Sequence, residues 1–317
     1  MVGVSRAVAR VVVAVLVVSL VLAGCGSDSK TSADRGSRRR APTTSAAPSR
    51  GQGVGPDSTS VAGSDPVIAA AGDIACPSAC TSTKTVGDML VDGNYTAVLT
   101  LGDNQYEDGR LTDFQRSYDP TWGRVKDKTF PTPGNHDYHD PGGADYYTYF
   151  GSRAGPAGKG YYSFDIGAWH FLSLNSEANT EAQIGWVKAD LAANHSRCTL
   201  AYWHKPIWTS GNTHRRDGDH MKPIWDALAA GAADVVLNGH VHNYERFAPR
   251  DGIRAFIVGT GGRDSHYGFA ETVPLSQVRD NSTDGLLRLT LHPEGYDWHF
   301  LPVPGGTFSD AGSGACR

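Results

Sequence analysis

Carboxylate, amide, phenol and imidazole side chains recur directly after short apolar runs of this sequence. They stand in Gly-Asp at 72–73, Gly-Asp-Asn-Gln-Tyr at 102–106, Gly-Asn-His-Asp at 134–137, His at 204 and Gly-His-Val-His at 239–242. Oxygen and imidazole ligands without thiolates suit Zn, Fe or Mn. The candidate metal ligands are Asp73, Asp103, Tyr106, Asn135, His204, His240 and His242. Two ions that share one carboxylate would use all of them, and such a pair can clamp the attacking and leaving oxygens of phosphoryl transfer.

The apolar runs before these side chains are typical of buried strands, because they are short and continuous. We expect strands at 67–72, 95–101, 130–133, 199–203, 233–237 and 255–258, and helices at 84–91, 180–193 and 221–230. Alternating apolar residues predict two hairpins, at 160–175 and 285–301. Strands that alternate with helices favour an α/β domain. The hairpins add antiparallel strands, so we predict a sandwich of two mixed β-sheets flanked by helices.

All five polar segments stand where strands of this arrangement end. Ligands bind outside the carboxyl ends of strands in open α/β sheets, so we expect the five segments to share one crevice. His136 follows Asn135 and is expected to face the crevice without being needed as a ligand. Asp137 is expected to support this turn, and residues 244–246 to orient the preceding histidine loop.

The order of these motifs resembles that of the calcineurin-like metallophosphoesterases. Many members carry a histidine ligand two residues after the first aspartate, where this chain has Ala75. Tyr106 stands three residues after Asp103 instead. This exchange resembles the purple acid phosphatases, in which a tyrosinate binds Fe(III). The run Gly-His-Val-His-Asn-Tyr-Glu-Arg at 239–246 is also similar to that family. The resemblance covers residue 66 to the C-terminus.

The resemblance implies a role for each candidate residue. It assigns Fe(III) to Asp73, Tyr106 and His242. It assigns a divalent ion (Zn, Fe or Mn) to Asn135, His204 and His240, with Asp103 as the bridge. It implies that His136 stabilises the transition state or protonates the leaving alcohol, and that His214 binds substrate. The implied reaction is hydrolysis of small phosphomonoesters with a metal-bound hydroxide as nucleophile.

Other functions are compatible with the same residues. A phosphodiesterase or a nucleotide hydrolase would use the same centre, and a surface lipoprotein could bind phosphate or metal ions without turnover. Arg215 and Arg216 either grip phosphate or are solvated loop residues. The loops at 138–159 and 262–282 are expected to select the substrate.

The N-terminal region predicts export. Arg6 and Arg10 precede an uncharged, mostly apolar run at 11–22, which is typical of a secretory signal. The tetrapeptide Leu-Ala-Gly-Cys that follows resembles a bacterial lipobox, so residues 1–25 are expected to be a lipoprotein signal with Cys25 as the lipidated residue. An ordinary cleaved signal is the alternative. Residues 26–65 are rich in Ser, Pro and Gly and predict a disordered tether, which would hold a catalytic domain at 66–317 on the extracytoplasmic face of the cell membrane.

The remaining cysteines and the net charge narrow the class of protein further. Four of the five cysteines remain once Cys25 is set aside as the lipid site. An even number of cysteines in an exported chain predicts disulfides. Cys76 and Cys80 enclose a tight loop and are expected to pair, which leaves Cys198 for Cys316. A zinc site is the alternative, and the wide spacing of the last two disfavours it. The formal net charge of −4 does not favour a nucleic-acid-binding protein.

Overall fold

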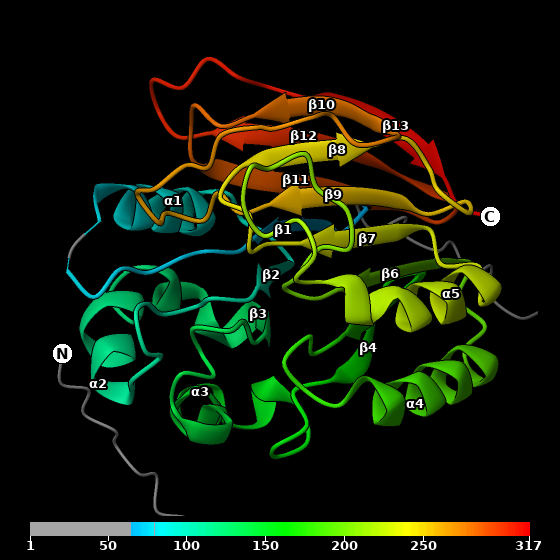
Figure 1. Ribbon diagram of the computed structural model, residues 1–317, viewed down its shortest axis with the longest axis horizontal. Helices are drawn as coiled ribbons and strands as arrows, with labels where there is room; N and C mark the ends of the chain where they lie inside the picture. Colours follow the sequence, from blue (N-terminus) through cyan, green and yellow to red (C-terminus); the bar gives the residue numbers. More distant parts are fainter. Residues whose placement is uncertain (1–64, 79) are drawn as a thin grey trace, which may run out of the picture. The chain divides into compact units, whose positions relative to one another are not determined.

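The computed structural model describes residues 65–78 and 80–317, which belong to one compact unit of the chain. Within these residues two β-sheets lie face to face, with helices outside them (Figure 1). The first sheet has the strand order β13-β12-β11-β1-β2-β3, and the second β10-β8-β9-β7-β6-β5-β4. The predicted sandwich of two mixed sheets is therefore confirmed. The predicted lipid site Cys25 and the predicted tether up to residue 64 lie outside the described residues.

The first sheet has three parallel strands that lead to the site and three antiparallel strands at the opposite edge of the sheet. Its strands are β1 (Val67–Ala71), β2 (Ala97–Leu101), β3 (Thr129–Thr132), β11 (Gly285–His292), β12 (Gly295–Pro302) and β13 (Ala311–Ala315). β1, β2 and β3 run parallel to one another. Pro131 is tolerated in β3 because β3 is an edge strand. Proline has no backbone N–H, and the open side of an edge strand has no neighbouring strand that would need one as a hydrogen-bond donor.

The second sheet is built around four parallel strands. Its strands are β4 (Tyr162–Ile166), β5 (Trp169–Ser173), β6 (Cys198–Tyr202), β7 (Val235–Asn238), β8 (Tyr244–Phe247), β9 (Arg254–Val258) and β10 (Ser276–Asp280). β5, β6, β7 and β9 are parallel. Every residue of β5, β6 and β7 is buried, as parallel strands covered on both faces require.

Helices cover the outer faces of the sheets. They are α1 (Thr81–Asp92), α2 (Leu111–Asp113), α3 (Ala144–Phe150), α4 (Thr180–Ala193) and α5 (Lys222–Ala230). α1 buries Val86 and Leu90, four residues apart on one face. α4 begins where the Asn179 side chain accepts a hydrogen bond from the Glu181 N–H, at the predicted residue. A short 3₁₀ turn precedes α5, so this helix begins one residue later than predicted.

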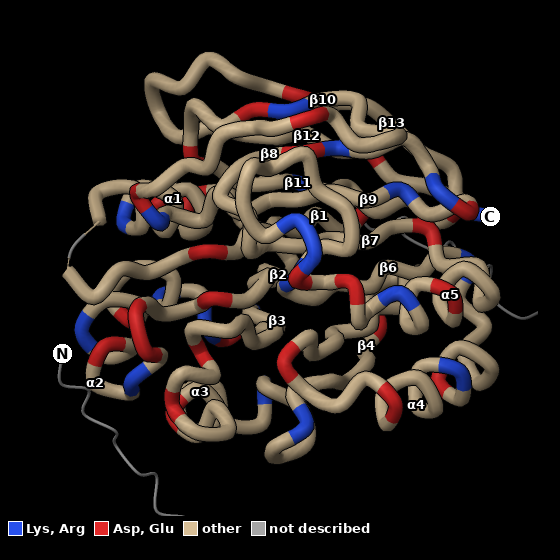
Figure 2. Tube along the Cα trace, in the orientation of Figure 1, with Lys and Arg blue, Asp and Glu red and all other residues tan. Residues whose placement is uncertain are grey.

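Two hydrophobic clusters hold these layers together. One fills the space between the sheets, where Leu99 of β2 and Phe256 of β9 are fully buried, and extends under α1. The other packs α4 and α5 on the second sheet through Val187, Leu228 and Val236. Acidic and basic residues are interspersed along the described chain (Figure 2).

Both predicted disulfides are present. Cys76 is bonded to Cys80 between β1 and α1. Cys198 is bonded to Cys316 and so joins the start of β6 to the last strand. The predicted helices and hairpins are present too, whereas β8, β10, β13, α2 and α3 were not predicted. No helix among the described residues combines the length and the apolar character that a membrane span needs.

Candidate dinuclear metal centre

The candidate ligands come from the carboxyl ends of strands in both sheets. Asp73 follows β1, Asp103 and Tyr106 follow β2, and Asn135 follows β3. The second sheet supplies its imidazoles from His204 after β6 and from His240 and His242 after β7. The backbone at Asp73, Asp103 and His240 has φ of 62°, 48° and 70°, which is unusual for residues other than glycine. Such conformations cluster at functional sites, where the surrounding fold holds them in place.

Each buried aspartate has one oxygen anchored by the backbone and the other directed at side chains. Asp73 Oδ2 accepts the His240 N–H at 2.8 Å, and Asp103 Oδ1 accepts the His136 N–H at 2.8 Å. The first bond crosses between the two sheets. Gly134 is required beside the hydrogen bond between Asp103 and His136, because a Cβ at position 134 would collide with Asp103 Oδ1. The oxygens that remain, Asp73 Oδ1 and Asp103 Oδ2, are the ones that meet the other candidates.

The three imidazoles show the same division between an anchored and a directed atom. His204 Nδ1 donates to the Leu101 carbonyl at 2.8 Å, and His242 Nδ1 donates to the Ser265 carbonyl at 2.8 Å. His240 is anchored by its other nitrogen, since Nε2 donates to Asp217 Oδ2 at 3.0 Å. These hydrogen bonds leave the other nitrogen of each ring directed inward. Histidines that bind metal ions are oriented in the same way, by a carboxylate or carbonyl that accepts from the nitrogen not bound to the metal.

The inward atoms form two groups that meet at Asp103. In the first group the Tyr106 hydroxyl lies 2.8 Å from Asp73 Oδ1 and 3.1 Å from His242 Nε2. In the second group His204 Nε2 lies 3.1 Å from His240 Nδ1. Asp103 Oδ2 touches both groups, at 3.0 Å from the Tyr106 hydroxyl and 3.2 Å from His204 Nε2.

The donor set fits metal ions. Asp103, His204 and His240 have ligand atoms within 4.8 Å of one another. Asn135 Oδ1 is buried and has no hydrogen-bond partner among the described residues, which is costly for an amide oxygen unless a cation satisfies it. Oxygen and imidazole donors in this combination suit Zn, Fe or Mn. The structure thus brings together six of the seven predicted ligands, Asp73, Asp103, Tyr106, His204, His240 and His242. Asn135 follows β3 and precedes His136, whose N–H binds Asp103.

Protons balance the charges of these residues when no ion is bound. Burial disfavours the imidazolium of His204, but the adjacent Asp103 carboxylate outweighs burial and raises the pKa of His204 to about 9. Burial and the nearby His204 lower the pKa of His240 to about 3. Burial and the charges of Asp103 and Asp73 raise the pKa of Tyr106 far above its usual value. A metal ion bound by His204 and Tyr106 would therefore displace a proton from each.

His136 lies beside the centre but outside the two groups. Its Nε2 is 4.0 Å from Asp103 Oδ2, and its Nδ1 donates to the Glu107 carbonyl at 2.7 Å. Asp137 accepts hydrogen bonds from the backbone N–H of Gly134 and from the Asn104 side chain, as expected of a support for this turn. Burial and the nearby Asp103 raise the pKa of Asp137 to about 7.

His214 reaches the centre through Asp217. The two are joined by a bond of 2.9 Å between His214 Nδ1 and Asp217 Oδ2, the same oxygen that accepts from His240. The His214 and His240 rings lie 4.3 Å apart between centroids. Asp217 was not predicted, although its spacing of three residues from His214 was a usable signal. Arg216 pairs with Asp219, and both arginines of this loop line a separate pocket of about 480 Å³.

Two further residues of the 262–282 loop were not predicted as part of the site. The Tyr267 ring stacks on His242 with centroids 4.3 Å apart. The Arg263 guanidinium lies 4.9 Å from the centroid of the Tyr106 ring. Both support the expectation that this loop borders the site.

The expected role of residues 244–246 was wrong. The Tyr244 hydroxyl and the Arg246 guanidinium bind Asp310 near the C-terminus, at 2.7 and 2.6 Å. Glu245 Oε2 accepts the Ser210 N–H at 2.8 Å and therefore fixes the segment that leads to His214. Because side chains alternate across a strand, Tyr244 and Arg246 share one face, and Glu245 lies on the other.

Comparison with known proteins identifies the family. Residues 66–244, more than half of the chain, match the family described as calcineurin-like phosphoesterase. The chain belongs to this family. Purple acid phosphatase 18 of Arabidopsis thaliana is 30% identical over 185 residues, which cover 52% of this chain and 41% of that protein. The match thus spans less than half of the length of that relative.

Solved structures share the fold. A purple acid phosphatase from seeds of yellow lupin (Lupinus luteus) has a TM-score of 0.67 at 18% identity, covering 79% of this chain and 53% of that one. GAP50, the anchor in the inner membrane complex of Plasmodium, has a TM-score of 0.66 at 14% identity, covering 80% of this chain and 90% of that one. Since the second is described as an anchor, the fold alone does not define the activity.

We predict that metal binding becomes tighter as the pH rises from about 6.5 to 9, by at least about tenfold per pH unit. The reason is that His204 carries a proton over this range, and a metal ligand must lose it. Calorimetric titration of the metal-free protein with Zn²⁺, in buffers of different ionisation enthalpy, counts the protons released.

The variant His204→Gln should release about one proton fewer than the wild type, and the exposed His139→Gln should release the same number. Equal proton release by His204→Gln and the wild type would contradict the prediction.

Proposed function

We propose that this chain is an exported, lipid-anchored phosphatase of the purple acid phosphatase type, which hydrolyses phosphate monoesters at a centre of two metal ions. The proposal rests above all on Asp103 Oδ2, which lies 3.0 Å from one group of donors and 3.2 Å from the other. A carboxylate oxygen in that position suits a bridge between two ions. When bound, such a pair activates a water molecule for attack and neutralises the phosphoryl oxygens.

The two groups of donors suit different ions. Asp73, Tyr106 and His242 supply two anionic oxygens and one imidazole, which favour a trivalent ion such as Fe(III). Asn135, His204 and His240 supply neutral donors, which favour a divalent ion such as Zn, Fe or Mn. Asp103 serves both. The resemblance of the motifs to purple acid phosphatases supports the same division.

His136 is suited to protonate the leaving oxygen. Its Nδ1 is committed to the Glu107 carbonyl, so only Nε2 faces the centre. Donation from Nε2 requires a ring that carries both protons. In the balanced reaction water adds to phosphorus, the ester P–O bond breaks, and this proton passes to the departing alkoxide. His214 would bind the phosphoryl oxygens, with Asp217 fixing its orientation.

Steady-state assays of the metal-replete protein test the activity. We expect faster turnover of p-nitrophenyl phosphate than of bis-p-nitrophenyl phosphate. We expect His136→Ala to lower kcat by about 100-fold on an alkyl phosphate, because that leaving group needs the proton. The loss should be smaller on p-nitrophenyl phosphate, whose leaving group departs as an anion. His139→Ala, whose ring lies 4.5 Å from that of His136, is the control.

Faster turnover of the bis-ester, or of a nucleoside triphosphate, would favour a phosphodiesterase or a nucleotide hydrolase on the same centre. A metal-replete protein without hydrolysis would favour a surface lipoprotein that only binds its ligand.

Metal analysis with a visible spectrum tests the ligand assignment. We expect iron together with a divalent metal, and a broad visible absorption band from the Tyr106–Fe(III) bond. Tyr106→Phe should remove the band, because the donor oxygen is lost. Tyr267→Phe keeps the ring that stacks on His242 and should retain the band. A colourless wild type loaded only with zinc or manganese would contradict the ferric assignment and leave the phosphoesterase proposal standing.

The lipid anchor is a separate part of the proposal. The two disulfides of the described residues support an oxidising compartment. In a bacterial host the wild type should fractionate with membranes, and Cys25→Ser should be released into the soluble extracytoplasmic fraction. Equal partition of the two proteins would contradict the anchor without affecting the activity.

A further inference from the structure

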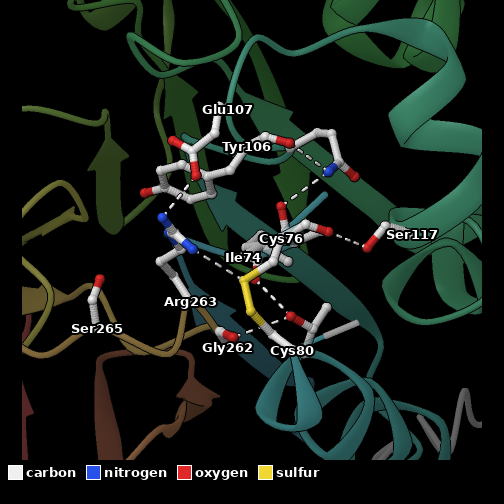
Figure 3. The surroundings of a disulfide bond; sticks show 12 residues. Ile74, Cys76, Cys80, Tyr106, Glu107, Ser117, Gly262, Arg263 and Ser265 are labelled. Carbon is white, nitrogen blue, oxygen red and sulfur yellow. Dashed lines mark hydrogen bonds and ion pairs between the residues drawn. A yellow bond between two sulfur atoms is a disulfide. The ribbon is translucent and has the colours of Figure 1, made fainter. Parts of the chain in front are cut away.

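Arg263 lies on the face of the candidate tyrosine ligand. Its guanidinium carbon is 4.9 Å from the centroid of the Tyr106 ring. In Figure 3 the guanidinium lies between the Tyr106 ring and the Cys76–Cys80 disulfide. The Tyr106 hydroxyl is engaged elsewhere, with Asp73 and Asp103. The positive charge is therefore next to the ring, whereas the candidate metal ligands surround the oxygen.

Three contacts fix the guanidinium and its backbone in this position. The Arg263 N–H donates to the Asp73 carbonyl at 3.0 Å. Nη1 lies 3.4 Å from Cys76 Sγ, and Nη2 donates to Glu107 Oε1 at 2.7 Å. Arg263 is thus tied to both loops of the first sheet that carry the first group of candidate ligands.

Hydrogen bonds hold the chain on both sides of the disulfide. The Thr83 hydroxyl at the start of α1 donates to the Ile74 carbonyl at 2.9 Å and lies 3.1 Å from the Gly262 carbonyl. The Ser117 hydroxyl donates to the Cys76 carbonyl at 2.5 Å. Arg263 therefore packs against the Cys76–Cys80 disulfide on one side and the tyrosine ring on the other.

A cation over an aromatic face attracts the π electrons of the ring. For a phenolate ligand, this attraction lowers the energy of the donor electrons and weakens donation to the metal. The Arg263 side chain is 27% exposed and Glu107 is 50% exposed, so solvent reduces the effect without removing it.

We propose that Arg263 is a positioning residue that sets the electron-donor strength of Tyr106, with the Cys76–Cys80 disulfide as its support and Glu107 as its counter-charge. This inference rests on the proposed function, because it takes Tyr106 to be a ligand of Fe(III). In this proposal Arg263 acts on the Tyr106 ligand and does not bind substrate, because its Nη2 and Nη1 already face Glu107 and the disulfide.

The visible band of the iron-loaded protein tests this role directly. The band reports transfer of charge from the phenolate to iron, and a cation nearer the ring than the iron raises its energy. Arg263→Gln should move the band to longer wavelength and lower the Fe(III)/Fe(II) reduction potential. Arg263→Lys keeps the charge and should restore most of both values. Glu107→Gln removes the counter-charge and should move the band to shorter wavelength.

Arg124→Gln is the matched control, because Arg124 also pairs with a carboxylate, that of Asp88 in α1, away from Tyr106. It should leave the band unchanged. A merely structural Arg263 would change the melting temperature but not the order of the band positions among the variants. A substrate-binding Arg263 would raise KM and leave the band of the substrate-free protein in place.

Three outcomes decide the inference. The inference is supported if the wild type is coloured, if the band of Arg263→Gln lies at a longer wavelength than that of the wild type, and if the band of Glu107→Gln lies at a shorter one. A coloured wild type whose band is the same in both variants overturns it and leaves the ferric assignment intact. A wild type that binds iron without colour overturns the ferric assignment and this inference together. If Arg263→Gln does not fold, the Glu107→Gln and Arg263→Lys spectra still decide the direction.

Discussion

The structure depends on holding two carboxylates, Asp73 and Asp103, in a buried position where two sheets meet. Isolated buried anions are strongly disfavoured, so the fold must compensate them. It does so in two ways at once. A backbone N–H from the neighbouring loop holds one oxygen of each carboxylate, and a phenol and imidazoles surround the other. The bond from His240 to Asp73 also joins the loops of the two sheets, so the electrostatic requirement and the packing of the sandwich are satisfied by the same contact.

The sequence allowed the strands and the candidate ligands to be predicted for a physical reason. Short, continuous apolar runs such as those of β1, β2, β6 and β7 are typical of parallel strands covered on both faces, and the carboxyl ends of such strands meet at one edge. The polar residues that follow must then lie together, and the structure brings together Asp73, Asp103, Tyr106 and the three histidines. Strands such as β10 and β13 escaped prediction because their residues are polar or small and show no apolar alternation.

The residues that orient the candidate ligands were harder to predict, because their positions depend on contacts distant in the sequence. Arg263 contacts Cys76 across 187 residues and Glu107 across 156. No periodic pattern marks such a residue in a loop. Asp217 was closer to prediction, since it lies three residues from His214. The error at residues 244–246 has a related cause: nearness in sequence to the histidine loop suggested contact with it, whereas the alternation of a strand directs these side chains to Asp310 and Ser210.

Hydrogen bonds among the candidate ligands satisfy the buried carboxylates of the site. The Tyr106 hydroxyl lies within hydrogen-bond distance of both Asp73 and Asp103, and protonated His204 pairs with Asp103. The outer nitrogen of each imidazole is anchored by a hydrogen bond, which holds the inward nitrogen in the orientation that a metal ligand needs. Metal binding would change the charge of the site. Two carboxylates with one imidazolium leave the site net negative, whereas the proposed trivalent and divalent ions would make it net positive even after Tyr106 loses its proton. A phosphate dianion is therefore repelled by the metal-free site and attracted by the loaded one.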